Sequence, residues 1–250
     1  MKNKYDLKYY SKEKAEKRDK YFKNKPLFFE NGIDTNKIFF DYILDEINKN
    51  PKKKLSMVDL GTGTGYVPKT LCKLTKANLN IVGIDLSKDM MDLAKQENQD
   101  KRINYKTADN NKLPFKNNSF DIVTNKLSTQ FSVKEVYRVL KNNGIFVFKE
   151  YSKFKGFKEI SKIFNKRFNK SNKTFDDYIK EIQKLDCKEV ILQKFLLKRV
   201  YSLKEIKDIF SIANLIEDFN KKDIDKIKNK LLKNNKIIIT SDPFIIFFRK

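Results

Sequence analysis

The sequence contains no histidine and no tryptophan, and it has only two cysteines, Cys72 and Cys187. Without histidine, a histidine general base and any histidine-containing metal site are both excluded. The two cysteines lie far apart in the sequence, and neither belongs to a Cys-x-x-Cys pair, so no thiolate metal cluster can be assembled. We therefore predict no metal site, and thiols that stay reduced in the cytoplasm.

Long apolar segments are missing as well. The longest apolar run, Pro243–Phe248, is far shorter than the roughly 20 residues that are needed to cross a bilayer. The N-terminal stretch Met1–Phe22 lacks the apolar centre of a secretory signal. We predict a cytoplasmic protein without a membrane segment. At 250 residues and 40% apolar content, the chain is long enough to bury a sizeable core.

Negative charge is scarce relative to positive charge. Lysine and arginine total 55 residues against 32 aspartates and glutamates, which gives a formal net charge of +23. Such an excess is typical of proteins that bind nucleic acids. However, only six of the 55 are arginine, the residue that phosphate and base recognition favour. Codon usage in an AT-rich genome is the simpler explanation for so much lysine, and a polyanion-binding face stays open as the alternative.

Between Lys54 and Tyr151, short apolar runs alternate with amphipathic stretches of helical length. The expected strands are Lys54–Leu60, Leu79–Asp85, Arg102–Thr107, Ser119–Thr124 and Ile145–Glu150. Helices are expected at Val67–Thr75, after Ser87 or Asp89 as N-cap, and at Ser132–Leu140. This repetition predicts an α/β fold in which helices cover both faces of a parallel sheet.

The pattern is looser after Tyr151. Helices are expected at Phe157–Phe168, Phe175–Leu185, Leu203–Ile216 and Lys222–Lys236, and strands at Lys188–Tyr201 and Pro243–Arg249. We predict a single domain over residues 1–250. In it, residues 1–50 form a helical extension over the ligand mouth, 54–151 form the ligand-binding core, and 152–250 complete the sheet on the substrate side.

The most specific stretch is MVDLGTGTGYV, residues 57–67, which follows the first expected strand. Gly61, Gly63 and Gly65 alternate with threonines, whereas a dinucleotide fingerprint would require a glycine at the position of Tyr66. The loop therefore departs from the nicotinamide pattern. It still lets backbone N–H groups approach a ligand closely at the mouth of a parallel sheet.

Three carboxylates lie at the ends of three successive expected strands. Asp59 is placed to accept from an amino-acid ammonium, Asp85 from the hydroxyls of a ribose, and Asp109 from the exocyclic amine of a purine. A cationic nucleoside that carries an amino acid fits all three carboxylates. S-adenosylmethionine is such a molecule.

With these residues in view, the chain resembles class I S-adenosylmethionine-dependent methyltransferases. The matching stretches run in the family's order and spacing from Lys54 to Tyr151. They are VDLGTGTG, VGIDLSKDMMDLAK, TADNNKLPFKNNSFDIVTNKLS and EVYRVLKNNGIFVFKEY. Within the family, the chain is most similar to the broad group that methylates small molecules, biosynthetic intermediates and some RNA bases. The resemblance implies a Rossmann-like, seven-stranded, mostly parallel sheet with helices on both faces and S-adenosylmethionine as the cofactor.

The resemblance also implies which residues hold the cofactor. They are Asp59, Gly61, Gly63, Gly65, Asp85, Leu86, Met90, Asp109, Asn110 and Asn125. Lys126, Glu150 and Tyr151 lie at strand ends that face the expected substrate, and they are weak candidates for a direct chemical role. A substrate that arrives deprotonated would need no base, whereas an amine or phenol would need a proton acceptor such as Glu150 or Tyr151.

Several alternatives stay open at this point. Asp85 can be read as a helix cap beside Ser87, and Met90 as a core residue. For the whole chain, we expect an enzyme that methylates a small or medium-sized acceptor by in-line displacement. The alternatives are an rRNA or tRNA base methyltransferase with a lysine-rich footprint, a nucleic-acid-binding module without catalysis, and a cofactor-binding regulator.

Overall fold

The computed structural model describes Glu13, Glu16, Lys17 and residues 32–128 and 130–250. Most of the helical extension predicted over residues 1–50 lies outside these residues. Residues 35–49 form helix α2 (Thr35–Lys49), which packs on the sheet. In the part of the chain that the structure describes, no helix is both long and apolar enough to cross a membrane.

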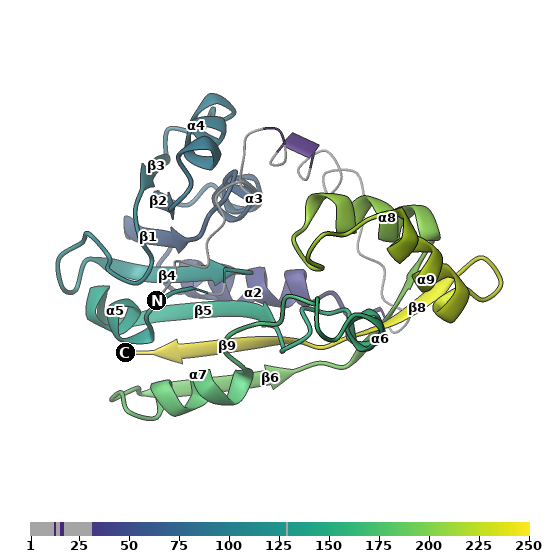
Figure 1. Ribbon diagram of the computed structural model, residues 1–250. Helices are drawn as coiled ribbons and strands as arrows, with labels where there is room; N and C mark the ends of the chain where they lie inside the picture. The colour runs from purple at the N-terminus through teal and green to yellow at the C-terminus, as the bar shows by residue number, and fades with distance from the viewer. Residues whose placement is uncertain (1–12, 14–15, 18–31, 129) are drawn as a thin grey trace.

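A seven-stranded sheet forms the centre of the molecule (Figure 1). In spatial order its strands are β3 (Ile103–Thr107), β2 (Leu79–Asp85), β1 (Leu55–Leu60), β4 (Phe120–Lys126), β5 (Leu140–Tyr151), β9 (Pro243–Arg249) and β6 (Glu189–Lys194). The first five are mutually parallel, and β9 runs antiparallel to both β5 and β6. The prediction of a mostly parallel, Rossmann-like sheet of seven strands is confirmed.

Helices cover both faces of this sheet. One face buries apolar side chains of α2, α3 (Tyr66–Leu74) and α4 (Lys88–Gln96). The other face buries α5 (Val133–Val139) and α7 (Phe175–Ile182). Each buried face follows the helical spacing of its apolar residues, as Val133, Val136 and Val139 show for α5. Because an apolar core packs against each face of the sheet, the strands have fixed positions, and so do the loops at their ends.

The C-terminal half contributes more than the two strands that complete the sheet. Its remaining elements are α6 (Lys158–Ile163), β7 (Leu197–Tyr201), α8 (Leu203–Ile212), α9 (Lys221–Leu231) and β8 (Ile237–Ser241). They enclose a third apolar core, and β7 pairs with β8 in a separate two-stranded sheet. In Figure 1 these elements lie together beyond the carboxyl ends of β4 and β5. We call them the C-terminal unit.

Two local expectations differ from the structure. The single strand expected over Lys188–Tyr201 is divided into β6 and β7, which lie in different sheets. The break falls at Phe195 and Leu196, where no glycine or proline signals it. The strand expected at Ile145–Glu150 begins earlier, because β5 starts at Leu140 and contains an irregularity, with Asn143 at a φ of 66° and a shift in the pairing with β4.

Candidate functional site

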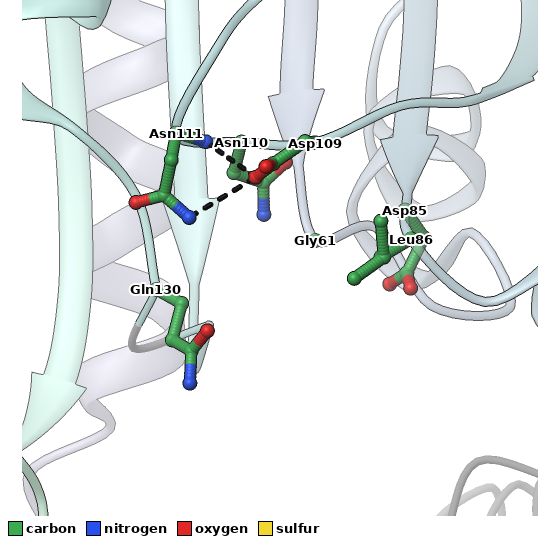
Figure 2. A pocket seen from close by; sticks show the side chains of 7 residues that line it. All are labelled: Gly61, Asp85, Leu86, Asp109, Asn110, Asn111 and Gln130. Carbon is green, nitrogen blue, oxygen red and sulfur yellow. Dashed lines mark hydrogen bonds between the residues drawn. The ribbon is translucent and has the colours of Figure 1, made fainter. Parts of the chain in front are cut away.

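The parallel strands bring their carboxyl ends to one edge of the sheet, where a small pocket opens (Figure 2). Its lining comes from the segments that follow four neighbouring strands, β1 to β4. The lining residues are Gly61, Asp85, Leu86, Asp109, Asn110, Asn111 and Gln130. Five of the ten residues predicted to hold the cofactor are in this set. Open α/β sheets bind their ligands at this edge.

The glycine loop turns tightly between β1 and α3. Gly61, Gly63 and Gly65 have φ values of 63°, 56° and 87°, in the left-handed region that favours glycine. A Cβ on Gly61 would overlap the hydroxyl group of Ser128, and one on Gly65 would overlap the phenol of Tyr105. The loop therefore depends on glycine both for its backbone conformation and for its close approach to neighbouring side chains.

We expect Gly61→Ala to destabilise the fold by about 1–3 kcal/mol, because it combines an unfavourable φ with an overlap at Ser128. Urea unfolding measures this loss. Gly32→Ala is the matched control, since Gly32 has a similar φ of 68° and no atom lies within 4 Å of its added Cβ. Equal losses for the two variants would show that the contact with Ser128 contributes nothing.

Asp85 ends β2 and connects the glycine loop to the next helix. One carboxylate oxygen accepts from the backbone N–H of Gly63 at 3.0 Å, and the other accepts from that of Ser87 at 2.9 Å. Ser87 itself caps α4 by accepting from the N–H of Met90. The capping role therefore belongs to Ser87, while Asp85 lines the pocket beside Leu86, whose exposed fraction is 38%.

The opposite wall follows β3. Asp109 accepts hydrogen bonds from the backbone and the side-chain amide of Asn111, at 2.8 and 3.0 Å (Figure 2). Asn110 is buried, and its amide nitrogen donates to the hydroxyl of Ser128 at 3.3 Å. Its side-chain oxygen has no hydrogen-bond partner among the described residues. This wall therefore offers acceptor groups to a ligand with N–H donors.

The other five predicted cofactor residues are not among the residues that line the pocket. Gly63 and Gly65 shape the loop, and Met90 packs in the core under α4. Asp59 is almost fully buried and accepts from the Thr124 hydroxyl at 2.7 Å. Burial is the main cause that raises the pKa of Asp59 to about 6. Asn125 is buried too, and its side-chain oxygen accepts from the N–H of Ser128.

The three candidates for chemistry lie at the ends of β4 and β5. Glu150 is buried, and one of its carboxylate oxygens accepts from the N–H of Tyr151 at 2.8 Å. The other oxygen has no partner within the described residues. Burial raises the pKa of Glu150 to about 7 and lowers that of Lys126 to about 8. Both groups therefore change protonation near neutral pH.

Sequence reasoning missed several side chains at this edge. Asn111 and Gln130 line the pocket, while Lys149 and Arg199 are buried near Lys126. Lys149 had a readable signal, because it interrupts the apolar strand sequence FVFKEY. Arg199 had none, since β7 was not separated from β6. Among the described residues, no cluster of side chains could hold a metal ion.

Comparison with known proteins adds to this geometry. Residues 58–148 match the family described as a methyltransferase domain. The ubiquinone/menaquinone biosynthesis C-methyltransferase UbiE of Geotalea daltonii is 33% identical over 141 residues, which are 52% of this chain and 57% of that protein. The demethylmenaquinone methyltransferase of Lactobacillus johnsonii is 37% identical over 97 residues, 35% of this chain and 40% of that protein. The chain thus spans about half the length of the curated relatives it matches.

Solved structures share the fold at low identity. The YcgJ protein of Bacillus subtilis aligns with a TM-score of 0.58 and 20% identity, covering 84% of this chain and 98% of that chain. Phosphoethanolamine N-methyltransferase 2 of Haemonchus contortus, solved with S-adenosyl-L-methionine, aligns with a TM-score of 0.59 and 18% identity, covering 96% and 57%. Residues 58–148 of this chain are therefore similar to methyltransferase domains, and the described residues share the fold of these solved structures.

Proposed function

We propose that the protein binds S-adenosylmethionine at the carboxyl edge of β1–β4 and transfers its methyl group to a small or medium-sized acceptor. The observation that carries this proposal is the position of Asp85, whose carboxylate lines the pocket directly beside the glycine loop. A carboxylate at the end of β2 is suited to bind the two hydroxyls of a ribose. Leu86 then lies against the base, and Asp109 with Asn110 accepts from its amine.

The glycine loop fits the same cofactor. Gly61 lines the pocket, and its left-handed φ lets the chain turn tightly at the end of β1, where backbone groups can approach a ligand closely. The buried oxygen of Asn110 that has no partner in the described part of the chain is a further acceptor in this pocket. Asp59 does not line the pocket, and its carboxylate connects β1 to β4 by accepting from the Thr124 hydroxyl.

When bound, the cofactor supplies an electrophilic sulfonium methyl group, and methyl transfer leaves a neutral thioether. The protein's part is to align the acceptor and to exclude water. If the attacking atom carries a proton, Glu150 is placed to take it, because its pKa of about 7 leaves much of the carboxyl ionised at neutral pH. Lys126 ends the neighbouring strand and faces the same region.

Two observations support a small acceptor. The curated relatives are named for methylation in quinone biosynthesis, which is small-molecule chemistry. In addition, Lys149 near the carboxyl end of β5 is buried rather than exposed to a polyanion.

Calorimetry with S-adenosylhomocysteine and with NAD tests the cofactor. We expect binding of the first and none of the second, because Tyr66 occupies the position where the dinucleotide pattern requires glycine. Incubation of a metabolite extract with labelled methyl donor should then yield a small labelled product. Tight NAD binding without S-adenosylhomocysteine binding would contradict the proposal.

An RNA acceptor would give a different result in the same assay. Label would enter bulk RNA, and the affinity for RNA would fall steeply with salt, with a log–log slope of about −0.7 per phosphate contact. Such a slope, with no labelled small product, would replace the small-molecule acceptor by RNA and leave the cofactor assignment intact.

A further inference from the structure

Two lysines lie side by side at the carboxyl edge of the sheet. Lys126 of β4 and Lys149 of β5 are register partners on parallel strands, so their side chains leave the same face of the sheet. Lys149 is only 1% exposed, and Lys126 is half-buried. Like charges in neighbouring positions of a sheet destabilise it. A lysine pair in this position therefore indicates a function that uses both positive charges.

Neither ammonium group is neutralised by a close carboxylate. Among the described residues, no carboxylate oxygen lies within 4.0 Å of either lysine nitrogen. Lys149 donates to the side-chain oxygen of Asn36 at 2.6 Å, and the nitrogen of Lys126 lies 4.5 Å from the ring centre of Tyr66. These neutral partners orient the two lysines but do not compensate for the buried charge.

A third cation reaches the same place from the C-terminal unit. Arg199 of β7 is buried, and its guanidinium carbon lies 5.9 Å from the ring centre of Tyr151. The nitrogen of Lys149 is 6.0 Å from the same ring centre. The positive charge of Arg199 lowers the pKa of both lysines, so all three cations share one electrostatic environment.

The carboxylates that the structure describes near Lys126 and Lys149 do not fully offset the charge of these two lysines. Burial raises the pKa of Glu150 to about 7 and that of Asp59 to about 6, so part of each is protonated near neutral pH. Asp34 is exposed, and its carboxylate caps α2 by accepting from two backbone N–H groups. Burial is also the main cause that lowers the pKa of Lys149 well below its ordinary value. An added anion would restore the charged form of the lysines.

We propose that the methyl acceptor carries an anionic group, a carboxylate or a phosphate ester, and that Lys126, Lys149 and Arg199 bind it. This inference rests on the proposed methyl transfer, because it assigns the acceptor side of that site. Two ammonium groups and one planar guanidinium in one electrostatic environment match the several oxygens of either group. The ring of Tyr66 lies beside Lys126, and that of Tyr151 lies near Lys149 and Arg199, so aromatic surface is available for an apolar remainder of the acceptor.

Calorimetry on the protein saturated with S-adenosylhomocysteine tests the inference with three probes: phenyl phosphate, benzoate and neutral benzamide. We expect at least one anion to bind at least tenfold more tightly than benzamide, and the tighter anion identifies the group. Lys149→Met and Arg199→Met should each weaken that anion at least tenfold, because a buried charge pair is lost. Affinity for S-adenosylhomocysteine should change less than twofold in both.

Lys198→Met is the matched control, since Lys198 is the exposed neighbour of Arg199 on β7. It should leave anion binding unchanged. At pH 9, anion binding should be accompanied by proton uptake, which is measured from the dependence of the binding enthalpy on the ionisation enthalpy of the buffer. Lys149→Met should reduce this proton uptake. Equal binding of benzoate, phenyl phosphate and benzamide, or unchanged anion binding in both variants, overturns the inference. If S-adenosylhomocysteine itself fails to bind, the proposed function fails instead.

Discussion

Glu150→Gln is expected to lower kcat by about 10²–10⁴, the range that general base catalysis contributes, for an acceptor whose attacking atom carries a proton. The amide keeps the hydrogen bond from the Tyr151 N–H but cannot take a proton. In the unmodified protein kcat should rise with pH through about 7, the pKa of Glu150. The variant should lack this rise, and a kcat profile from pH 5 to 9 measures the difference.

Two controls accompany this profile. Glu217→Gln removes an exposed carboxylate of the C-terminal unit and should leave the profile unchanged. Tyr151→Phe tests the other candidate proton acceptor and should retain the rise through pH 7. A rise that persists in Glu150→Gln and disappears in Tyr151→Phe would transfer the role to the phenol.

The same residue predicts a pH-dependent stability. Its pKa rises from 4.5 to about 7 on folding, so the folded state binds the proton more tightly than the unfolded state. The resulting stability is complete below pH 4.5 and is lost as the pH rises through 7. Glu150 is buried, so the loss amounts to about 3 kcal/mol. We expect the free energy of unfolding of Glu150→Gln, measured with urea over this pH range, to fall by about 3 kcal/mol less than that of the unmodified protein.

Asp85→Ala is expected to raise the Kd for S-adenosylhomocysteine about 100-fold. Loss of a charge-assisted hydrogen bond weakens an interaction by about 1.5–3 kcal/mol, and the upper value corresponds to two orders of magnitude. The loop loses an anchor as well, because Gly63 and Ser87 donate to this carboxylate. Calorimetry gives the Kd directly.

Asp92→Ala serves as the control, because Asp92 is exposed on α4 and its substitution removes the same charge close to the site. Its Kd should stay within twofold of the unmodified protein. A second variant, Asp85→Asn, keeps one acceptor oxygen and should fall between the two. A sharply lowered Tm for Asp85→Ala with an unchanged Kd would make Asp85 a structural residue.

The strands and loops expected to bind the cofactor could be predicted from the sequence because their signals are local. Short apolar runs predicted each strand from β1 to β5. The positions of Gly61, Asp85 and Asp109 after expected parallel strands predicted that these residues share one edge of the sheet. Parallel strands joined by helices leave few other arrangements. Asp59 and Met90 show the limit of such reasoning: both belong to the matched stretches, yet their side chains point into the interior. Sequence spacing alone does not determine that direction.

The region that we propose to bind the acceptor was harder to predict, because its contacts join residues that are distant in the sequence. Lys126, Lys149 and Arg199 meet only once β4, β5 and β7 are placed relative to one another. The strand β8 has the sequence IIITS, but its partner β7 was hidden inside the longer strand expected at Lys188–Tyr201. Without a turn signal at Phe195, a run of strand-forming residues does not reveal that it changes sheets.

The division of that run between β6 and β7 bears on the order in which the chain folds. Lys194 pairs with Phe244, and Leu197 pairs with Ser241, so β6–β9 and β7–β8 form successive parts of one antiparallel ribbon. The N–H of Phe195 donates to the carbonyl of Pro243 between them. Pairing that begins at β7–β8 brings β6 and β9 together without a separate search through the long intervening segment, which lowers the entropy loss of loop closure. We therefore expect the ribbon to assemble from its β7–β8 end, and the last sheet strands to join the parallel core after it.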